Sequence, residues 1–167
     1  MNSTPKISVI MPVYNGQTYL KEAIESILNQ TYEDFEFIIA YDESNDNSLE
    51  IIKEYQDMDS RIFLSVGCDR GLVKSLNDAI DISRGEYIAR MDADDISLSR
   101  RFEKQINYMV KEDLDICGTF IESFDKNTSF GVTSYPEKDE DIRFVLMFMT
   151  SFAHPSVIIK RTVFNNL

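Results

Sequence analysis

Short apolar runs alternate with helix-patterned segments along this chain, and this alternation restricts the folds it can adopt. The first run, Ile7 to Val13, is almost continuously apolar, which is typical of a strand covered on both faces of a sheet. A helical pattern follows, whose apolar positions are Leu20, Ala23, Ile24, Ile27 and Leu28. A second strand is expected over Phe35 to Tyr41, and a second helix over about Asp46 to Gln56.

The same alternation continues toward the C-terminus. We expect strands over 61–66, 86–91, 115–124, 130–135 and 156–159. Helices are expected around Leu72 to Ile80, after Ser99, and over 141–150, and Asn47-Ser48-Leu49-Glu50 predicts the cap of the second helix. Repeated strand–helix–strand units predict an α/β fold with a mostly parallel central sheet flanked by helices. No repeat or linker divides the chain, so one domain is expected over residues 1–167.

The charge balance excludes several kinds of partner. The chain has 17 basic and 29 acidic residues, a formal net charge of −12, which disfavours binding to nucleic acid or to anionic lipid. The same charge repels a nucleotide unless a metal ion stands between them. The two cysteines, Cys68 and Cys117, lack metal-type spacing and are expected to be reduced thiols of a cytoplasmic protein. The longest apolar run, Phe144 to Ala153, has about half the length of a membrane span.

Polar or acidic residues follow three of the predicted strands. These segments are Tyr14-Asn15, Asp42 to Ser44, and Asp92 to Asp95. Ligands of parallel sheets bind beyond the carboxyl ends of the strands, so the three segments predict a binding site. The ring of Tyr14 suits a planar base, although a Tyr there also suits plain packing. The Asp42 carboxylate can accept a hydrogen bond from a base N–H or a ribose hydroxyl, and it also suits a simple turn.

The acidic segment is the main candidate for chemistry. It reads Arg90-Met91-Asp92-Ala93-Asp94-Asp95, and clustered carboxylates repel one another unless a cation is present. Oxygen-only ligands favour Mg²⁺ or Mn²⁺, which usually also bind substrate phosphates. The alternative is a solvated acidic turn or a helix cap. His154, the single histidine, is either structural or in contact with metal or phosphate. No dinucleotide-binding glycine motif and no phosphate-binding loop is present.

Taken together, these segments resemble the family 2 glycosyltransferases, which have the GT-A fold, a Rossmann-like α/β architecture. The resemblance extends from Ile7 onward, in the family's order and spacing. The matching segments are ISVIMPVYNG (Ile7 to Gly16), SILNQTYEDFEFIIAYDESNDNS (Ser26 to Ser48), RGEYIARMDADD (Arg84 to Asp95) and AHPSVIIKR (Ala153 to Arg161).

The resemblance implies a role for individual residues. Pro12, Val13 and Tyr14 would line the nucleotide pocket, and Asp42 matches the aspartate that binds the base, usually uracil. Asp92-Ala93-Asp94 matches the DXD motif, in which Asp94 would ligate Mn²⁺ or Mg²⁺ and Asp92 would lie near the ribose and metal. Three further residues fall in segments that approach the donor: Lys74, Asn77 and His154, the last with a metal or diphosphate role.

The resemblance also implies a reaction and shows two departures. The implied enzyme is inverting, and it moves a sugar from a nucleoside diphosphate sugar, expected to be a UDP-sugar, to a saccharide or lipid-linked acceptor hydroxyl. Bacterial polysaccharide or glycolipid synthesis at the inner membrane face is the expected setting. Tyr41-Asp42-Glu43-Ser44 stands where the family often has Asp-Asp-Gly-Ser. The chain has no match to the family's catalytic base, which is expected beyond Leu167.

The missing base makes the chain resemble the N-terminal donor-binding portion of a longer enzyme, truncated at its C-terminus. Two alternatives therefore stay open. One is a fragment that binds nucleotide without catalysis. The other is an enzyme like the sugar-nucleotide pyrophosphorylases, which would need a glycine-rich loop where Tyr14-Asn15-Gly16-Gln17 stands.

Overall fold

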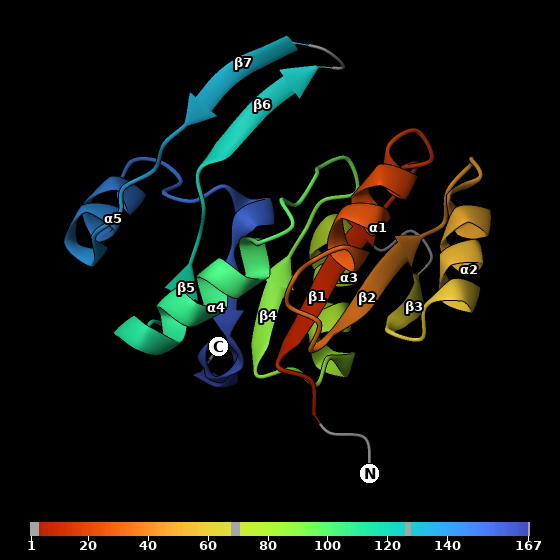
Figure 1. The fold of residues 1–167 in the computed structure, drawn as a ribbon, viewed down its shortest axis with the longest axis horizontal. Helices are drawn as coiled ribbons and strands as arrows, with labels where there is room; N and C mark the ends of the chain where they lie inside the picture. The colour runs from red at the N-terminus through yellow and green to blue at the C-terminus, as the bar shows by residue number, and fades with distance from the viewer. Residues whose placement is uncertain (1–3, 68–70, 126–127, 167) are drawn as a thin grey trace.

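The computed structural model describes residues 4–67, 71–125 and 128–166. A six-stranded sheet has the order β3-β2-β1-β4-β8-β5 and forms the centre of the fold (Figure 1). Its strands are β1 (Ile7–Val13), β2 (Phe35–Asp42), β3 (Ile62–Gly67), β4 (Tyr87–Arg90), β5 (Ile116–Cys117) and β8 (Ile158–Lys160). The helices are α1 (Leu20–Leu28), α2 (Ser48–Met58), α3 (Gly71–Ile82), α4 (Arg101–Glu112) and α5 (Asp139–Leu146), with 3₁₀ turns η1 (His154–Ser156) and η2 (Arg161–Asn166). A separate hairpin contains β6 (Ile121–Asp125) and β7 (Thr128–Thr133).

The first four strands are parallel, as the sequence predicts. Each is joined to the next by a helix, and β1 pairs in parallel with both β2 and β4. The sheet becomes mixed only at one side, where β8 pairs antiparallel with β4 and with β5. The mostly parallel α/β fold expected from the alternation is therefore confirmed. Its parallel arrangement places the ends of β1, β2 and β4 at a common edge.

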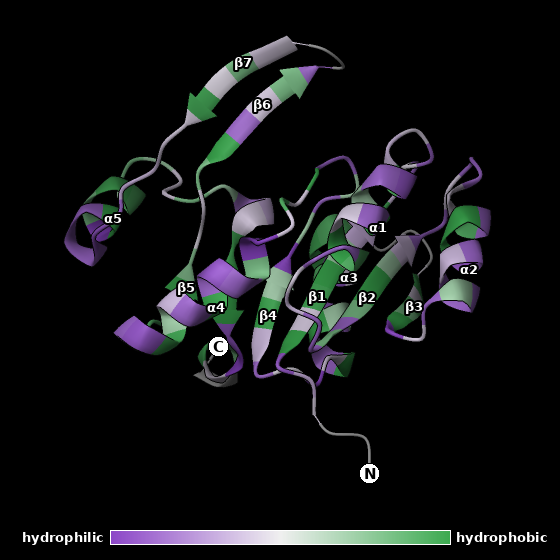
Figure 2. Cartoon of the chain, viewed as in Figure 1, coloured by the Kyte–Doolittle hydropathy of each residue, from purple (hydrophilic) through white to green (hydrophobic). Residues whose placement is uncertain are grey.

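Both faces of the sheet are covered. Residues that alternate along β1 and β2 pack with α1, α2 and α4 into the larger apolar cluster, which includes Phe37 and Phe102. The intervening residues, among them Ile10 and Ile38, face α3 and form a smaller cluster on the other side. Figure 2 shows the hydrophobic strands between helices that are hydrophilic on their outer faces. Burial on both faces explains why the first two strands read as continuous apolar runs.

A buried carboxylate joins the amino ends of β1 and β2 to the turn before β4. Glu36 accepts hydrogen bonds from Ser8 Oγ at 2.6 Å and from the Arg84 backbone N–H at 2.6 Å. The Arg84 guanidinium donates from Nε at 2.8 Å and from Nη2 at 2.6 Å. Burial alone raises the pKa of Glu36, but these bonds and the Arg84 charge hold it below its usual value. Glu36 thus stays ionised within the fold at neutral pH.

Gly85 allows the turn before β4 to lie against β1. Its backbone N–H donates to Ser8 Oγ at 2.7 Å. A Cβ at this position would stand 2.4 Å from the Ser8 nitrogen and 2.6 Å from the Ile7 carbonyl carbon. Those atoms belong to the backbone of β1, which cannot move aside without disturbing the sheet.

The predicted boundaries are wrong in the last third of the chain. The single strand expected over 115–124 is split into β5 and β6, because the chain leaves the sheet at Gly118. A Cβ on Gly118 would stand 2.7 Å from Cδ1 of Phe152, and Thr119 N–H donates to Ser156 Oγ at 3.0 Å. The strand expected over 156–159 begins at Ile158, after η1. The helix expected over 141–150 spans Asp139–Leu146.

The predicted cap of α2 also differs. Asn47 lies at the N-cap position, but its side chain makes no capping hydrogen bond. The Ser48 N–H donates instead to Oδ1 of Asp46 at 3.0 Å. The carboxylate therefore satisfies the first turn of α2 from one residue further upstream.

The hairpin β6–β7 and helix α5 stand apart from the central sheet (Figure 1). Large apolar side chains are exposed on them and in the turn after α5, namely Phe124, Phe130 and Val132 on the hairpin, Phe144 and Leu146 on α5, and Phe148 in the turn. Helix α5 buries none of its residues. Among the described residues, no helix has both the length and the apolar character needed to cross a bilayer.

Candidate functional site

A cleft of about 870 Å³ opens at the carboxyl ends of β1, β2 and β4 and at the start of α3. The chain turns away from the sheet at each of these ends, so polar residues of three loops converge there. Predicted donor-binding residues that line this cleft are Pro12, Val13, Tyr14, Asp42, Asp92, Ala93 and Asp94. The edge predicted from the sequence is therefore the edge at which the structure has its cleft.

Hydrogen bonds between the turns after β1 and β2 fix one side of the cleft. Asn15 has a left-handed backbone with φ of 50°, and its N–H donates to Ser44 Oγ at 3.0 Å. In return its side-chain Oδ1 accepts from the Asn45 N–H at 2.9 Å. Gly16 N–H donates to the buried Ser48 Oγ at 2.9 Å. These reciprocal bonds hold the turns together beneath Tyr14, whose residue is 65% exposed.

Asp42 is buried at the end of β2. Its Oδ1 accepts from the Glu43 N–H at 3.1 Å, and its Oδ2 accepts from the Gly71 N–H at 3.0 Å. Gly71 is the first residue of α3 and has a φ of 72°, in the region that favours glycine. Asp42 therefore couples the end of β2 to the start of α3, where both line the cleft.

The acidic segment forms the opposite side of the cleft. Asp92 Oδ1 accepts from Arg90 Nη2 at 2.9 Å, while Asp94 is exposed. Asp95 lies deeper, and burial, followed by repulsion from Asp92 and Asp94, raises its pKa. The three carboxylates therefore differ in environment, although they lie within four residues.

Arg101 supports this segment from the first turn of α4. Its Nη2 donates to the Arg90 carbonyl oxygen at 2.8 Å, and its Nε donates to Gln105 Oε1 at 3.0 Å. Burial lowers the pKa of Arg101 to about 10, against the opposing effect of Asp95. The guanidinium therefore stays protonated at neutral pH and supplies positive charge next to Asp95.

The carboxylates fit a cation that is shared with a substrate. Within 4–67, 71–125 and 128–166, no three His, Cys, Asp or Glu side chains are grouped to hold a metal ion. Two carboxylates, Asp92 and Asp94, do line the cleft. Mg²⁺ and similar cations are commonly held by one or two carboxylates together with substrate phosphates and water. The pair suits that arrangement better than an all-protein metal cage.

Three residues of the predicted site lie away from the cleft lining. Lys74 is paired with Asp78 at 3.1 Å, and Asn77 is exposed on α3. His154 is exposed in η1, with its Nε2 3.4 Å from Thr150 Oγ1. None of the three is among the residues that line the cleft.

The structure describes one of the two cysteines. Cys117 is free, and burial raises the pKa of its thiol. Cys68 lies outside the described residues.

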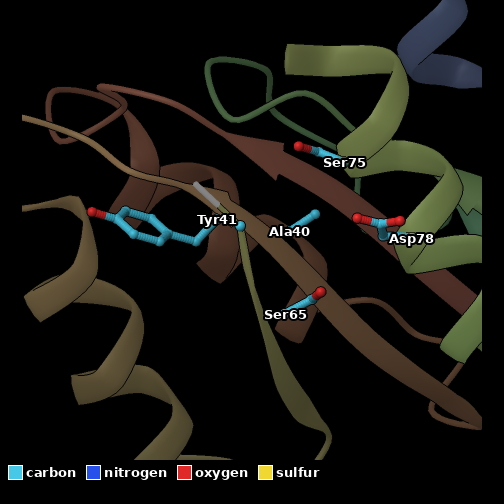
Figure 3. Close-up of a pocket in the computed structure, with 6 residues that line it drawn as sticks. Ala40, Tyr41, Ser65, Ser75 and Asp78 are labelled. Carbon is cyan, nitrogen blue, oxygen red and sulfur yellow. The ribbon is translucent and has the colours of Figure 1, made fainter. Parts of the chain in front are cut away.

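Several lining residues were not among the predicted site residues, namely Gly16, Thr18, Tyr19, Ala40, Asn45, Gly71, Leu72 and Ser75, whereas Asn15, Glu43 and Arg90 lie in the segments predicted to form the site. Many lie within a few residues of a predicted strand end, and that position was the available signal. Ala40 and Ser75 also line a shallow neighbouring recess between β2, β3 and α3 (Figure 3). Figure 3 shows Ala40 on the α3 side of β2 and the Tyr41 ring on the α2 side. The recess has no room for a ligand, so the cleft is the candidate site.

Comparison with known proteins identifies the family. The model described as "Glycosyl transferase family 2" matches residues 8–167. An uncharacterised glycosyltransferase of Methanocaldococcus jannaschii is 41% identical over 169 residues, covering 98% of this chain and 58% of its own. The O-antigen biosynthesis glycosyltransferase WbnJ of Escherichia coli is 39% identical over 161 residues, which cover 94% of this chain and 62% of WbnJ. The chain thus spans about three-fifths of the length of these curated relatives.

Solved structures share the fold at low sequence identity. TarS of S. aureus, in complex with UDP-GlcNAc, superposes with a TM-score of 0.76 at 21% identity, over 96% of this chain and 47% of that one. The mannosyltransferase PcManGT of Pyrobaculum calidifontis, in complex with GDP-Man and Mn²⁺, superposes with a TM-score of 0.69 at 18% identity, over 98% of this chain and 47% of that one. Both are GT-A glycosyltransferases, and the expected GT-A fold is therefore confirmed.

Proposed function

The chain belongs to glycosyl transferase family 2, and on that premise we propose that its cleft binds a nucleoside diphosphate sugar, with a UDP-sugar as donor. The observation that carries the proposal is the convergence of Tyr14, Asp42 and the Asp92–Asp94 segment on one cleft. Tyr14 offers a ring face to the base, and Asp42 offers a carboxylate at the end of β2. Pro12, Val13 and Ala93 belong to the apolar part of the lining. TarS, which shares the fold, binds UDP-GlcNAc.

A divalent cation, Mn²⁺ or Mg²⁺, is part of the proposal. In this proposal Asp94, which is exposed, ligates the cation, and Asp92 lies next to it on the same side of the cleft. Such a cation supplies Lewis-acid stabilisation of the charge that develops on the diphosphate leaving group. It also offsets the charge of a chain whose net charge is −12. Mn²⁺ in the PcManGT complex supports this choice.

Sugar transfer to an acceptor hydroxyl is proposed for the whole enzyme, with inversion at the anomeric carbon. An acceptor hydroxyl needs a general base, and that residue is proposed to lie outside these 167 residues. The O-antigen role of WbnJ supports a saccharide or lipid-linked acceptor in bacterial polysaccharide or glycolipid synthesis. Such an acceptor would place the enzyme in the cytoplasm, at the inner membrane face. The chain as given would then be one GT-A donor-binding domain.

Calorimetric titration of UDP, with and without Mn²⁺, tests the donor site, and GDP is the comparison nucleotide. We expect UDP to bind in the presence of Mn²⁺, and Asp94→Asn to weaken that binding by at least about tenfold, since a metal-bound carboxylate is lost. Asp94 is exposed, so the variant should unfold at the temperature of the wild type. Asp139→Asn, which removes the same charge from the exposed start of α5, is the matched control.

Two results would count against the proposal. If neither nucleotide binds to folded wild-type protein, the donor site is wrong. If Asp94→Asn binds UDP and Mn²⁺ as the wild type does, Asp94 does not ligate the cation. A longer chain that includes the remainder of the enzyme would then separate binding without catalysis from sugar transfer.

A further inference from the structure

Arg90 is the single basic residue among the described residues that line the cleft. We propose that Arg90 is an internal counter-ion of this site: it pairs with Asp92 when no cation is bound, and it donates to the donor diphosphate when a cation takes Asp92. The inference rests on the proposed function, because it concerns the same cleft. It assigns Arg90 as a donor-binding and positioning residue.

Two nitrogens of the Arg90 guanidinium, Nη2 and Nε, differ in their contacts. Arg90 Nη2 donates to Asp92 Oδ1 at 2.9 Å, with the Arg90 side chain 18% exposed and that of Asp92 30% exposed. Arg90 Nε is buried and has no hydrogen-bond acceptor among the residues that the structure describes. A buried N–H of a charged group is costly to leave unpaired, so an incoming acceptor gains from meeting it.

The backbone of Arg90 is fixed, while its head lies at the cleft. Arg90 is the last residue of β4, and its N–H donates to the Val157 carbonyl at 3.0 Å. Its carbonyl oxygen accepts from Arg101 Nη2 at 2.8 Å. The base of the side chain is therefore held from two sides. Redirection of the guanidinium from Asp92 to a ligand needs only side-chain rotation.

The charges that line the cleft favour a role for the Arg90 guanidinium in binding the diphosphate. Four carboxylates line it, from Asp42, Glu43, Asp92 and Asp94, against the one guanidinium. A diphosphate entering this field is repelled unless positive charge meets it. The planar fork of arginine suits phosphate oxygens as well as it suits a carboxylate. Arg90 and a divalent cation therefore compete for Asp92, and both attract the diphosphate.

This competition predicts effects of opposite sign in one variant. In Arg90→Gln, Asp92 is free for the cation, so Mn²⁺ alone should bind about tenfold more tightly than to the wild type. The diphosphate loses its protein partner, so UDP at saturating Mn²⁺ should bind about tenfold more weakly than to the wild type. Mn²⁺ binding is followed by the spin-resonance signal of free Mn²⁺, and UDP binding by calorimetry. A purely structural role would shift both affinities in the same direction, which would overturn the inference.

Arg100→Gln is the matched control for charge. It removes one positive charge from an exposed arginine that pairs with Glu103 at 3.1 Å and does not line the cleft. Both affinities should stay at their wild-type values in this variant. Equal shifts in Arg100→Gln and Arg90→Gln would mean that net charge alone acts, and would overturn the inference.

A second comparison leaves Arg90 in place, so it holds even if Arg90→Gln fails to fold. Asp92→Asn releases Arg90 and removes one charge, whereas Asp94→Asn removes one charge without releasing Arg90. In EDTA, Asp92→Asn should therefore bind UDP several-fold more tightly than Asp94→Asn. Equal affinities would overturn the inference while leaving Mn²⁺-dependent UDP binding by the wild type intact. Failure of the wild type to bind UDP with Mn²⁺ would instead remove the proposed function, and the inference with it.

Discussion

Replacing Glu36 with glutamine should destabilise the fold and change how its stability depends on pH. Glu36 accepts four hydrogen bonds, from Ser8 Oγ, from the Arg84 N–H and from two guanidinium nitrogens of Arg84. The oxygen of a glutamine can keep the first two. Its amide N–H₂ group would then face the guanidinium, donor against donor, so both charge-assisted bonds would be lost.

The expected size follows from the exposure of the two partners. Breaking a buried ion pair costs about 3–5 kcal/mol when the remaining charge stays buried. Here the remaining charge is Arg84, whose side chain is 50% exposed while that of Glu36 is 4% exposed. The guanidinium can turn to water, which lowers the cost to about 2–3 kcal/mol. For a chain of this size, that loss lowers the melting temperature by about 4–12 °C.

The pH dependence identifies the carboxylate as the cause. The pKa of Glu36 is lower in the folded than in the unfolded chain, so its stabilisation is fully present above the unfolded value, about 4.3. It is lost as the pH falls through the lower, folded value. The Glu36→Gln variant has no such titration. The difference in free energy of unfolding between wild type and variant should therefore be largest at neutral pH and shrink below about pH 4.

Urea unfolding followed by circular dichroism, at several pH values between 7 and 3.5, measures this difference. Glu103→Gln is the control. Because Glu103 forms an exposed ion pair with Arg100, this substitution should change the free energy of unfolding little. A difference that stays constant over this pH range would refute the role given to the ionised carboxylate. Equal stability of Glu36→Gln and Glu103→Gln at pH 7 would refute the energetic argument altogether.

Gly85→Ala and Ser48→Ala test the packing and the turns, with Gly16→Ala as the control for Gly85→Ala. Gly85→Ala should lower the free energy of unfolding by about 3 kcal/mol in urea titration, since its Cβ meets the backbone at Ser8. In Gly16→Ala the new Cβ would be 3.4 Å from its nearest neighbour, Cγ1 of Val13, so the free energy of unfolding should fall clearly less. Equal decreases in the two variants would contradict the steric argument. Ser48→Ala leaves the Gly16 N–H without its acceptor and should cost about 1–2 kcal/mol. It should also weaken UDP binding in calorimetry, and unchanged affinity would mean that these turns do not shape the cleft.

The sequence predicts the part of the fold whose pattern is set locally. Residues of β1 and β2 are buried on both faces, and such burial leaves a continuous apolar run that can be read directly. The rule that ligands bind at the carboxyl ends of parallel strands then located Tyr14, Asp42 and Asp92 together. These three residues indeed line one cleft.

Features that depend on distant residues could not be predicted in this way. The strand expected over 115–124 breaks because Phe152 and Ser156 crowd Gly118 and bind Thr119, and no local pattern encodes these contacts. The antiparallel position of β8 is likewise set by tertiary pairing with β4. Arg90 and Asp92, which are joined by a hydrogen bond, are only two residues apart in the sequence. The role of this bond in the site depends on a cleft built by three strands.

The place of β8 between β4 and β5 has a consequence for synthesis on the ribosome. Residues 91–157 must be translated before β8 can pair with β4. At roughly 5–20 residues per second, this stretch takes several seconds, and during that time the nascent chain has an open strand edge at β4. The acidic turn that follows β4 is therefore attached to an incomplete sheet until β8 has left the exit tunnel. Codon-dependent slowing within residues 91–157 would lengthen the interval in which that edge can pair with a neighbouring nascent chain.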